Sequence, residues 1–153
     1  MNEKIGLTLA EAAPDLHRLC HDRWAVIGSA AVSLVGAVVS VADIDVLTSV
    51  EDADRLASCW RSRSEDNYTP AGAERFRSRF GRFRFSGLPL EVMGGLELFD
   101  QGAWQAVQIG ERMFVSCGPV QIPVPAIADQ IRILECFARP KDLQRAALLR
   151  ALA

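Results

Sequence analysis

The sequence predicts an α+β fold in which helices flank a sheet. Three observations predict it: segments with the two-residue period of strands, amphipathic segments with the helical period near both ends, and a strand–turn–helix–strand pattern in residues 24–49. The chain has 153 residues, 50% of them hydrophobic, so a single domain over residues 1–153 can bury a core. We expect that core over about residues 8–125 and a C-terminal helical pair over about 125–152.

Composition excludes several classes of protein. The net charge of -2 gives no overall attraction to nucleic acid, so RNA is a possible partner only through a local basic patch. The N-terminus lacks a signal-peptide pattern and no apolar run is long enough to span a bilayer, which predicts a cytoplasmic protein with no membrane partner. Cysteines 20, 59, 117 and 136 form no CxxC pair, which favours reduced, mostly buried thiols.

The first element is a helix that we expect over residues 8–22. Residues 8–11, TLAE, have the capping-box pattern of a helix start. Within this helix His17, Cys20 and His21 share a face, at a spacing that could bind zinc or copper. Because no remote fourth ligand stands out, the favoured interpretation is a pair of histidines around a core cysteine.

Two acidic residues mark the strand expected over residues 43–48. Residues two apart in a strand point to the same side, so Asp43 and Asp45 lie together while Ile44 and Val46 point into an apolar layer. Two adjacent carboxylates are costly unless the site is solvated, one group is protonated, or a cation binds between them. A divalent cation resolves this cost, and Mg²⁺ prefers a few carboxylates together with water and phosphate.

A possible phosphate site precedes these acids. Gly28 and Ser29 end the first expected strand and lead into a helix over about residues 30–38. Glycine allows a close approach to a ligand, and the backbone N–H groups of a helix start are free to bind an anion. A phosphate site beside two carboxylates indicates nucleoside triphosphate chemistry.

These residues resemble the signature of the nucleotidyltransferase superfamily, which has the DNA polymerase beta-like fold. That signature is a Gly-Ser or Gly-Gly turn followed by a strand with an acid, a hydrophobic residue and a second acid, as in Gly28-Ser29 and residues 43–46, DIDV. The family usually adds a third carboxylate on a later strand, and Glu91 in residues 88–93, LPLEVM, fits that position. The resemblance implies a mixed twisted sheet flanked by helices.

The resemblance also implies an activity. A nucleoside monophosphate would pass from an NTP to an acceptor hydroxyl, with Asp43, Asp45 and Glu91 holding two Mg²⁺ or Mn²⁺ ions. One ion would activate the acceptor and the other would stabilise the leaving oxygen. Ser29 and the N–H groups after Gly28 would position the phosphates. The acceptor, whether small molecule, RNA or protein, and the oligomeric state, including a homodimer or a partner protein, are left open.

The middle of the chain is basic and aromatic. A helix capped by Ser49 comes first, followed by a polar loop over residues 62–74 that could form part of the acceptor pocket. The next segment, residues 75–85, reads RFRSRFGRFRF. It predicts strands around Gly81 with phenylalanines inward and arginines outward. Arg82 and Arg84 are candidates to bind triphosphate or RNA, since arginine favours bidentate phosphate contacts. The alternative is an edge strand kept soluble by charge.

A turn and a short strand follow. Residues 90–93 carry Glu91 and are expected to end at Gly94-Gly95, and residues 96–106 are expected to form a short helix or irregular segment with Trp104 in the core. The alternative for Glu91 is a glutamate that points to solvent from a half-buried sheet.

The C-terminal third predicts a hairpin and then two helices. Residues 112–117 and 120–124 pair across a Gly-Pro turn, Pro125 suits the first turn of a helix to about residue 138, and a last helix covers residues 142–152. Residues 139–142, RPKD, resemble a stretch that follows the catalytic core in abortive-infection and antibiotic-modifying nucleotidyltransferases, which makes Lys141 a candidate nucleotide contact. The alternative is ordinary capping charge.

Two other functions stay open beside the transferase. A catalytically silent nucleotidyltransferase-like module could bind a nucleotide or a protein, and the small size of the chain is consistent with this. A toxin–antitoxin component would modify a tRNA or a protein. The sequence has no P-loop, GxGxxG or GxSxG motif, so the commonest competing enzymes are not indicated.

Overall fold

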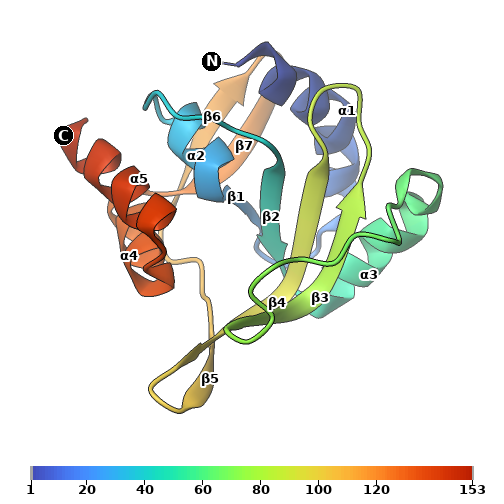
Figure 1. Cartoon of the computed structure of the whole chain (residues 1–153). Coiled ribbons are helices and arrows are strands. Elements are labelled where there is room, and N and C mark those ends of the chain that lie inside the picture. The colour runs from blue at the N-terminus through green and yellow to red at the C-terminus, as the bar shows by residue number, and fades with distance from the viewer. Residues whose placement is uncertain (1, 153) are drawn as a thin grey trace.

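The computed structural model describes residues 2–152 and combines helices with a mixed sheet (Figure 1). Its helices are α1 (Glu3–Leu19), α2 (Gly28–Leu34), α3 (Val50–Cys59), α4 (Ile127–Phe137) and α5 (Pro140–Ala151), with a 3-10 turn at Arg61–Arg63. Its strands are β1 (Ala25–Ile27), β2 (Ile44–Thr48), β3 (Phe76–Phe83), β4 (Leu90–Asp100), β5 (Ala103–Ala106), β6 (Arg112–Cys117) and β7 (Val120–Pro125). The α+β fold class and the C-terminal helical pair are confirmed.

The main sheet has the strand order β1-β2-β4-β3, and β5 pairs with the far end of β4. Strands β2 and β4 are parallel, whereas β1–β2, β3–β4 and β4–β5 are antiparallel. The central parallel pair needs a long crossover connection, which α3 and β3 provide. The β6–β7 hairpin forms a second small sheet.

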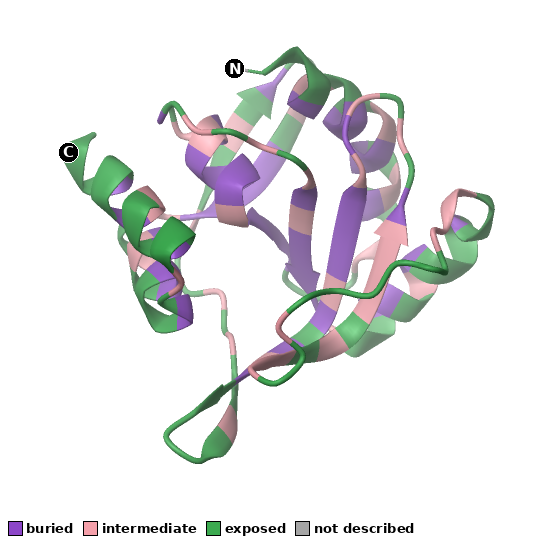
Figure 2. Ribbon diagram, in the orientation of Figure 1, coloured by how far each residue is buried: buried purple, intermediate pink, exposed green. Residues whose placement is uncertain are grey.

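The two faces of the main sheet are covered differently. One face packs on α1, α2 and α3 in the largest core cluster, which includes Ile44 and Val46. The other face joins α4 through a smaller cluster of Ile27, Leu47, Leu96, Leu98, Ile133 and Phe137. Figure 2 shows the central strands as the most continuously buried part of the sheet. Since side chains alternate along β2, Asp45 lies on the face of Leu47, toward the C-terminal helices.

The N-terminal helix begins earlier than expected. Asn2 caps α1 by accepting a hydrogen bond from the Lys4 backbone N–H, so the prediction that residue 8 opens the helix is wrong. Thr8 is buried inside α1, where its hydroxyl donates to the Leu88 carbonyl and accepts from the Leu88 N–H. A threonine that resembles a cap in sequence therefore fixes the turn before β4.

Strand β4 continues through Gly94 and Gly95, where the sequence predicts its end. A Cβ atom at Gly94 would lie 2.6 Å from the Ala53 Cβ and 2.9 Å from the Ser49 carbonyl oxygen, so this glycine lets α3 approach the sheet closely. The prediction of a helix or irregular segment over residues 96–106 is also wrong, because this segment forms the β4–β5 hairpin. Trp104 is half-buried and packs on Phe99 rather than in the core.

Other boundaries differ by small shifts. Residues 76–83 form one strand, β3, that passes through Gly81 without a break. Pro125 is the last residue of β7, and Ala138 ends α4 in the left-handed conformation (φ 58°).

Cys59 and Cys136 are exposed, so the expectation of mostly buried thiols is wrong for these two. Over residues 2–152, no helix combines the length and the apolar character that crossing a membrane requires.

Candidate metal and nucleotide site

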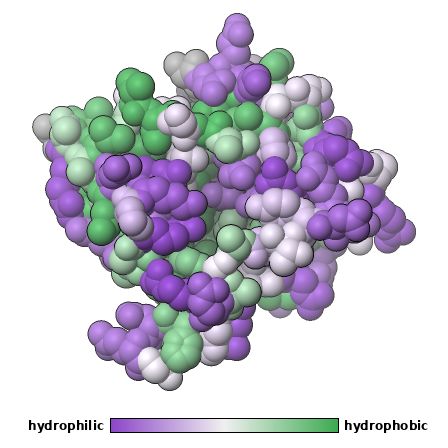
Figure 3. Space-filling model, in the orientation of Figure 1, coloured by the Kyte–Doolittle hydropathy of each residue, from purple (hydrophilic) through white to green (hydrophobic). Residues whose placement is uncertain are grey.

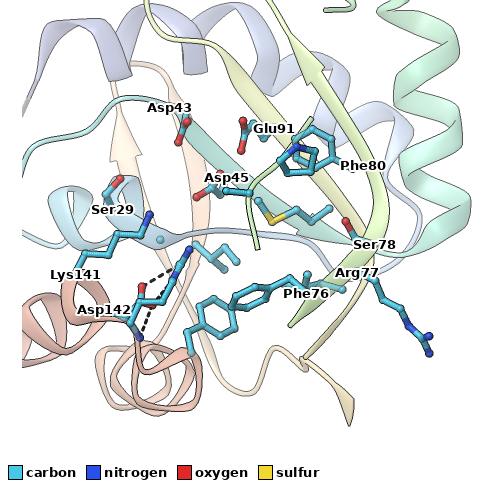
Figure 4. A pocket seen from close by; sticks show the side chains of 18 of the residues that line it. Ser29, Asp43, Asp45, Phe76, Arg77, Ser78, Phe80, Glu91, Lys141 and Asp142 are labelled. Carbon is cyan, nitrogen blue, oxygen red and sulfur yellow. Dashed lines mark hydrogen bonds and ion pairs between the residues drawn. The ribbon is translucent and has the colours of Figure 1, made fainter. Parts of the chain in front are cut away.

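Three carboxylates converge at one end of the parallel strand pair. Asp43 immediately precedes β2, and Asp45 on β2 lies directly opposite Glu91 on β4. One oxygen from each of the three residues lies within 4.8 Å of the others, and Figure 4 shows the three side chains around one point. Among residues 2–152, this is the one such grouping of three or more acidic, histidine or cysteine side chains.

Gly28 holds the chain against this cluster. Its φ of +67° lies in the left-handed region that favours glycine, and a Cβ atom there would lie 2.7 Å from Asp45 Oδ2. Helix α2 begins at Gly28, two residues earlier than expected, and Ser29 is buried in its first turn. Gly28 and Ser29 therefore line the same space as the three carboxylates, as the sequence predicts.

Burial makes the charge of Asp45 costly. Burial first, and then the negative charges of Asp43 and Glu91, raise the pKa of Asp45 well above its ordinary value. Burial and the Asp43 charge also raise the pKa of Glu91, although Arg82 opposes this. Asp45 Oδ1 is buried and has no hydrogen-bond partner among the described residues. A buried oxygen without a donor is a position that a cation would satisfy.

The three oxygen donors fit a hard divalent cation. Mg²⁺ and Mn²⁺ accept carboxylate oxygens and keep open positions for water and phosphate. Cysteine and histidine, which softer metals prefer, do not belong to the cluster. The donor set and the orphaned Asp45 oxygen are therefore suited to Mg²⁺ or Mn²⁺.

Arg82 lies inside the cluster rather than on the outer surface. Its Nη1 contacts Asp43 Oδ2 at 3.3 Å and also pairs with Glu91 Oε2, while its Nε donates to Glu65 Oε2 at 3.0 Å. The Tyr68 ring covers the guanidinium, with 4.3 Å between the guanidinium carbon and the ring centroid. The expectation that all the arginines of this strand point outward is wrong for Arg82.

A pocket of about 450 Å³ opens beside the carboxylates. The sheet, the loop before β3 and the C-terminal helices form its walls, and the space-filling view shows a hollow between those helices and the sheet, with polar side chains on both sides (Figure 3). Its apolar lining comes mainly from Ile27, Tyr68, Phe76, Phe80, Met93, Leu96 and Phe137. The loop was expected to contribute, and it supplies Tyr68, Pro70, Ala71 and Ala73.

The first turn of α5 brings positive charge to this pocket. Lys141 and Arg145 line it, and Lys141 is directed toward Ser29 (Figure 4). Within residues 139–142, Asp142 caps the start of α5, which is the alternative that the sequence left open. Asp142 is buried, accepts a hydrogen bond from the Arg139 backbone N–H at 3.2 Å and pairs with the Arg139 guanidinium at 2.6 Å. The candidate nucleotide contact is therefore Lys141, with Asp142 as structural support.

Some sequence-predicted residues lie elsewhere. Arg84 is exposed, donates to the Ser64 carbonyl at 3.3 Å and does not line the pocket. His17 is hydrogen-bonded to the Gln121 carbonyl (2.9 Å) and packs edge-on against Trp24. Cys20 follows the end of α1, and burial, the main cause, raises the pKa of its thiol to about 12. The backbone N–H of His21 donates to Asp52 Oδ1 at 2.9 Å.

Sequence reasoning did not single out Tyr68, Phe137 or Arg145 as pocket residues. Tyr68 lies in a loop without periodicity, and Phe137 lies near the end of α4, where an apolar residue is ordinarily explained by packing. Arg145 could have been found from helical spacing, because it lies four residues after Lys141 and therefore on the same side of α5.

Three solved structures are similar to this chain. A nucleotidyltransferase candidate from Thermotoga maritima is 24% identical and has a TM-score of 0.67, with 94% of this chain and 92% of that chain covered. The lincosamide antibiotic adenylyltransferase LnuA, solved with lincomycin bound, is 10% identical with a TM-score of 0.62, and 100% and 98% of the two chains are covered.

The third is the antibiotic-resistance factor ANT(2'')-Ia, whose solution structure reveals substrate-regulated conformation dynamics. It is 15% identical and has a TM-score of 0.53, with 99% of this chain and 82% of that chain covered. No protein-family model matches the sequence, and the search of curated proteins gave no match. The likeness in backbone across nearly the whole chain, at low sequence identity, identifies the fold.

Proposed function

We propose that this chain, which has the nucleotidyltransferase fold, transfers a nucleoside monophosphate from an NTP to an acceptor hydroxyl. The observation that carries the proposal is the meeting of Asp43, Asp45 and Glu91 beside Gly28 and Ser29 in one pocket. These carboxylates would hold two Mg²⁺ or Mn²⁺ ions, which when bound would neutralise the triphosphate and activate the acceptor. A packing role alone does not explain why three acids lie together, or why the buried Oδ1 atom of Asp45 has no hydrogen-bond partner among the described residues.

Other residues of the pocket would bind the triphosphate and take part in the transfer. Lys141 and Arg145 would contact the triphosphate, and Ser29 with the N–H groups after Gly28 would position its phosphates. The acceptor oxygen would form a bond to the α-phosphorus while the bond from that phosphorus to the bridging oxygen breaks and pyrophosphate leaves. Glu91, beside the ion that would hold the acceptor, would help to take up the proton of the acceptor hydroxyl.

The pocket favours a small-molecule acceptor over RNA. Phe76 and Phe80 line the pocket and are only half-exposed, so they do not form an open platform on which RNA bases could stack. Two of the similar structures are an antibiotic adenylyltransferase and an antibiotic-resistance factor. We therefore place a hydroxyl-bearing small molecule first among the acceptors. The toxin–antitoxin role and a partner protein stay predictions.

One observation favours a catalytically silent nucleotide-binding module as the second candidate. Arg82 already pairs with Asp43 and Glu91, so the cluster has a counter-charge without a metal. In a silent module, nucleotide would bind equally tightly with and without Mg²⁺, because phosphate recognition would rest on Lys141 and Arg145.

Calorimetric titration of ATP and GTP tests the proposal. The proteins are the wild type and an Asp43→Asn, Asp45→Asn double variant, each with Mg²⁺ and with chelator. A matched control replaces two exposed carboxylates, Asp54→Asn and Asp100→Asn. We expect Mg²⁺-dependent binding in the wild type and the control that weakens at least about tenfold in the site variant. Nucleotide turnover at the wild-type rate in the site variant would overturn the transferase.

A further inference from the structure

Strand register fixes Arg82 beside the acidic cluster. Arg82 on β3 lies directly opposite Glu91 on β4, and Glu91 lies directly opposite Asp45 on β2. Residues in register on neighbouring strands share a face of the sheet. The arginine and two of the carboxylates therefore form one row across three adjacent strands, and Asp43 at the start of β2 completes the group.

The guanidinium is held in this row by more contacts than a surface ion pair makes. Its side chain is 16% exposed, against 62% for Arg79, which reaches Asp54 at 3.6 Å from the same strand. Glu65 fixes the Nε edge, and Tyr68 covers the plane. The flat fork of arginine allows Nε and Nη1 to serve three carboxylates at once, which a lysine ammonium on a single stem does less well.

The formal charges indicate what this arrangement does to a metal. The guanidinium offsets part of the negative charge of Asp43 and Glu91, so the cluster needs less added positive charge than three carboxylates alone would. The Nη1 contacts with Asp43 and Glu91 also occupy lone pairs that a second ion would need. By contrast, the buried Asp45 Oδ1 has no donor among the described residues and stays open to an ion.

We propose that Arg82 is the resident counter-cation of the carboxylate site, so that the nucleotide-free protein binds one divalent cation and Arg82 occupies the place of a second. This inference rests on the metal site of the proposed function and adds the number of ions and the residue that limits it. A second ion enters only with the triphosphate, whose own negative charge offsets the repulsion and gives the guanidinium a new partner.

Mn²⁺ titration without nucleotide tests the inference. Binding is followed by calorimetry and by the electron paramagnetic resonance signal of free Mn²⁺, at mildly alkaline pH so that protons compete little for the ligands. We expect one ion per wild-type chain. In Arg82→Gln the affinity for that ion should rise at least about tenfold, because the nearby positive charge is gone. Arg79→Gln, a control on the same strand, should leave both values unchanged.

Two further variants keep the inference testable if Arg82→Gln folds poorly. Arg82→Lys retains the charge and should keep an affinity close to that of the wild type. Glu65→Gln removes a negative charge beside the site and leaves the guanidinium to Asp43 and Glu91, so it should lower the affinity, in the direction opposite to Arg82→Gln. In thermal melts, Mn²⁺ should raise the Tm of Arg82→Gln more than that of the wild type, because the uncompensated carboxylates destabilise the metal-free variant.

The outcomes separate the two proposals. One ion in the wild type and tighter binding in Arg82→Gln would support the counter-cation. The same stoichiometry and affinity in both proteins, or two ions in the nucleotide-free wild type, would overturn this inference and leave the metal site standing. No Mn²⁺ binding to either nucleotide-free protein would overturn this inference, and the ATP titration with Mg²⁺ and with chelator would then decide on the metal site.

Discussion

At the scale of single residues, Gly28 makes the site possible. Its φ is +67°, and a Cβ atom at this position would lie 2.7 Å from Asp45 Oδ2, so there is no room for a side chain. We expect Gly28→Ala to lower the free energy of unfolding by about 1–3 kcal/mol and to push the Asp45 carboxylate out of position. Mn²⁺ affinity should fall at least about tenfold, as measured by calorimetry.

Gly36 supplies a matched control for this substitution. Its φ is +111°, so alanine is strained there too, but a Cβ atom would meet nothing within 4 Å. Gly36→Ala should therefore be less stable than the wild type and bind Mn²⁺ normally. Weakened metal binding in both variants would show that backbone strain, and not the contact with Asp45, is responsible.

Ionisation of Asp45 predicts how stability changes with pH when no metal is bound. Because its pKa is raised, the folded chain keeps a proton that the unfolded chain has released between the ordinary carboxyl pKa and the raised one. The free energy of unfolding should therefore fall as pH rises through that window. Asp45→Asn should reduce this fall, with Glu91 contributing the remainder, and should be more stable than the wild type at neutral pH in chelator, as measured by urea unfolding.

The control for this pH profile is Asp54→Asn, since Asp54 is exposed on α3. That variant should keep the wild-type pH dependence. If the wild type and Asp45→Asn lose stability equally with rising pH, then the pKa of Asp45 is not raised in the folded chain.

At the scale of elements, Asp52 joins α3 to the chain between α1 and β1. Its carboxylate accepts from the backbone N–H groups of His21 and Asp22 and from the Thr48 hydroxyl, and it pairs with Arg55. Burial acts to raise the pKa of Asp52, but these hydrogen bonds and the Arg55 charge outweigh it and lower the pKa.

We expect Asp52→Ala to lower the free energy of unfolding by about 3 kcal/mol, because three hydrogen-bond donors lose their acceptor and Arg55 loses its partner. Urea unfolding measures this. Glu51→Ala, an exposed change in the same first turn of α3, should cost less than about 0.5 kcal/mol. A loss of under about 1 kcal/mol for Asp52→Ala would mean that water replaces the carboxylate in these contacts.

Local sequence patterns predicted most helices and strands. They failed where a contact between distant parts of the chain determines the structure. The alternation in residues 43–46 and the Gly-Pro turn of the β6–β7 hairpin are local signals, and the structure contains both elements. Gly94 resembles a strand end in sequence, but it is a packing glycine against α3. Arg82 points to the face that carries Asp45 and Glu91 because it lies in register with Glu91. The alternation within β3 alone does not contain this pairing with a neighbouring strand.

At the scale of the whole molecule, opposite ends of the sequence supply the two sides of the site. Residues 28–45 and Glu91 hold the acidic side, and Lys141 on α5 faces them. The carboxylates could be predicted from their spacing and order. The approach of α5 could not, because it depends on how α4 packs on the sheet through Ile133 and Phe137.

This division predicts that metal and nucleotide binding can be separated. Lys141→Ala should weaken ATP binding about tenfold in the presence of Mg²⁺ and leave Mn²⁺ binding without nucleotide unchanged. Calorimetry measures both. The other lysine of the chain, Lys4, is exposed on α1 and gives the control Lys4→Ala. Unchanged ATP affinity in Lys141→Ala would remove α5 from the nucleotide contacts.

The strand register also predicts an order of folding. Strands β3 and β4 are joined by a short turn, so Arg82 and Glu91 meet through a local contact, whereas the parallel β2–β4 pair closes a much longer loop. Glu91 is then already neutralised when Asp45 arrives beside it. The guanidinium thus lowers the electrostatic barrier to closing the sheet, and Arg82→Gln should refold more slowly than the wild type in stopped-flow experiments, most clearly at low salt.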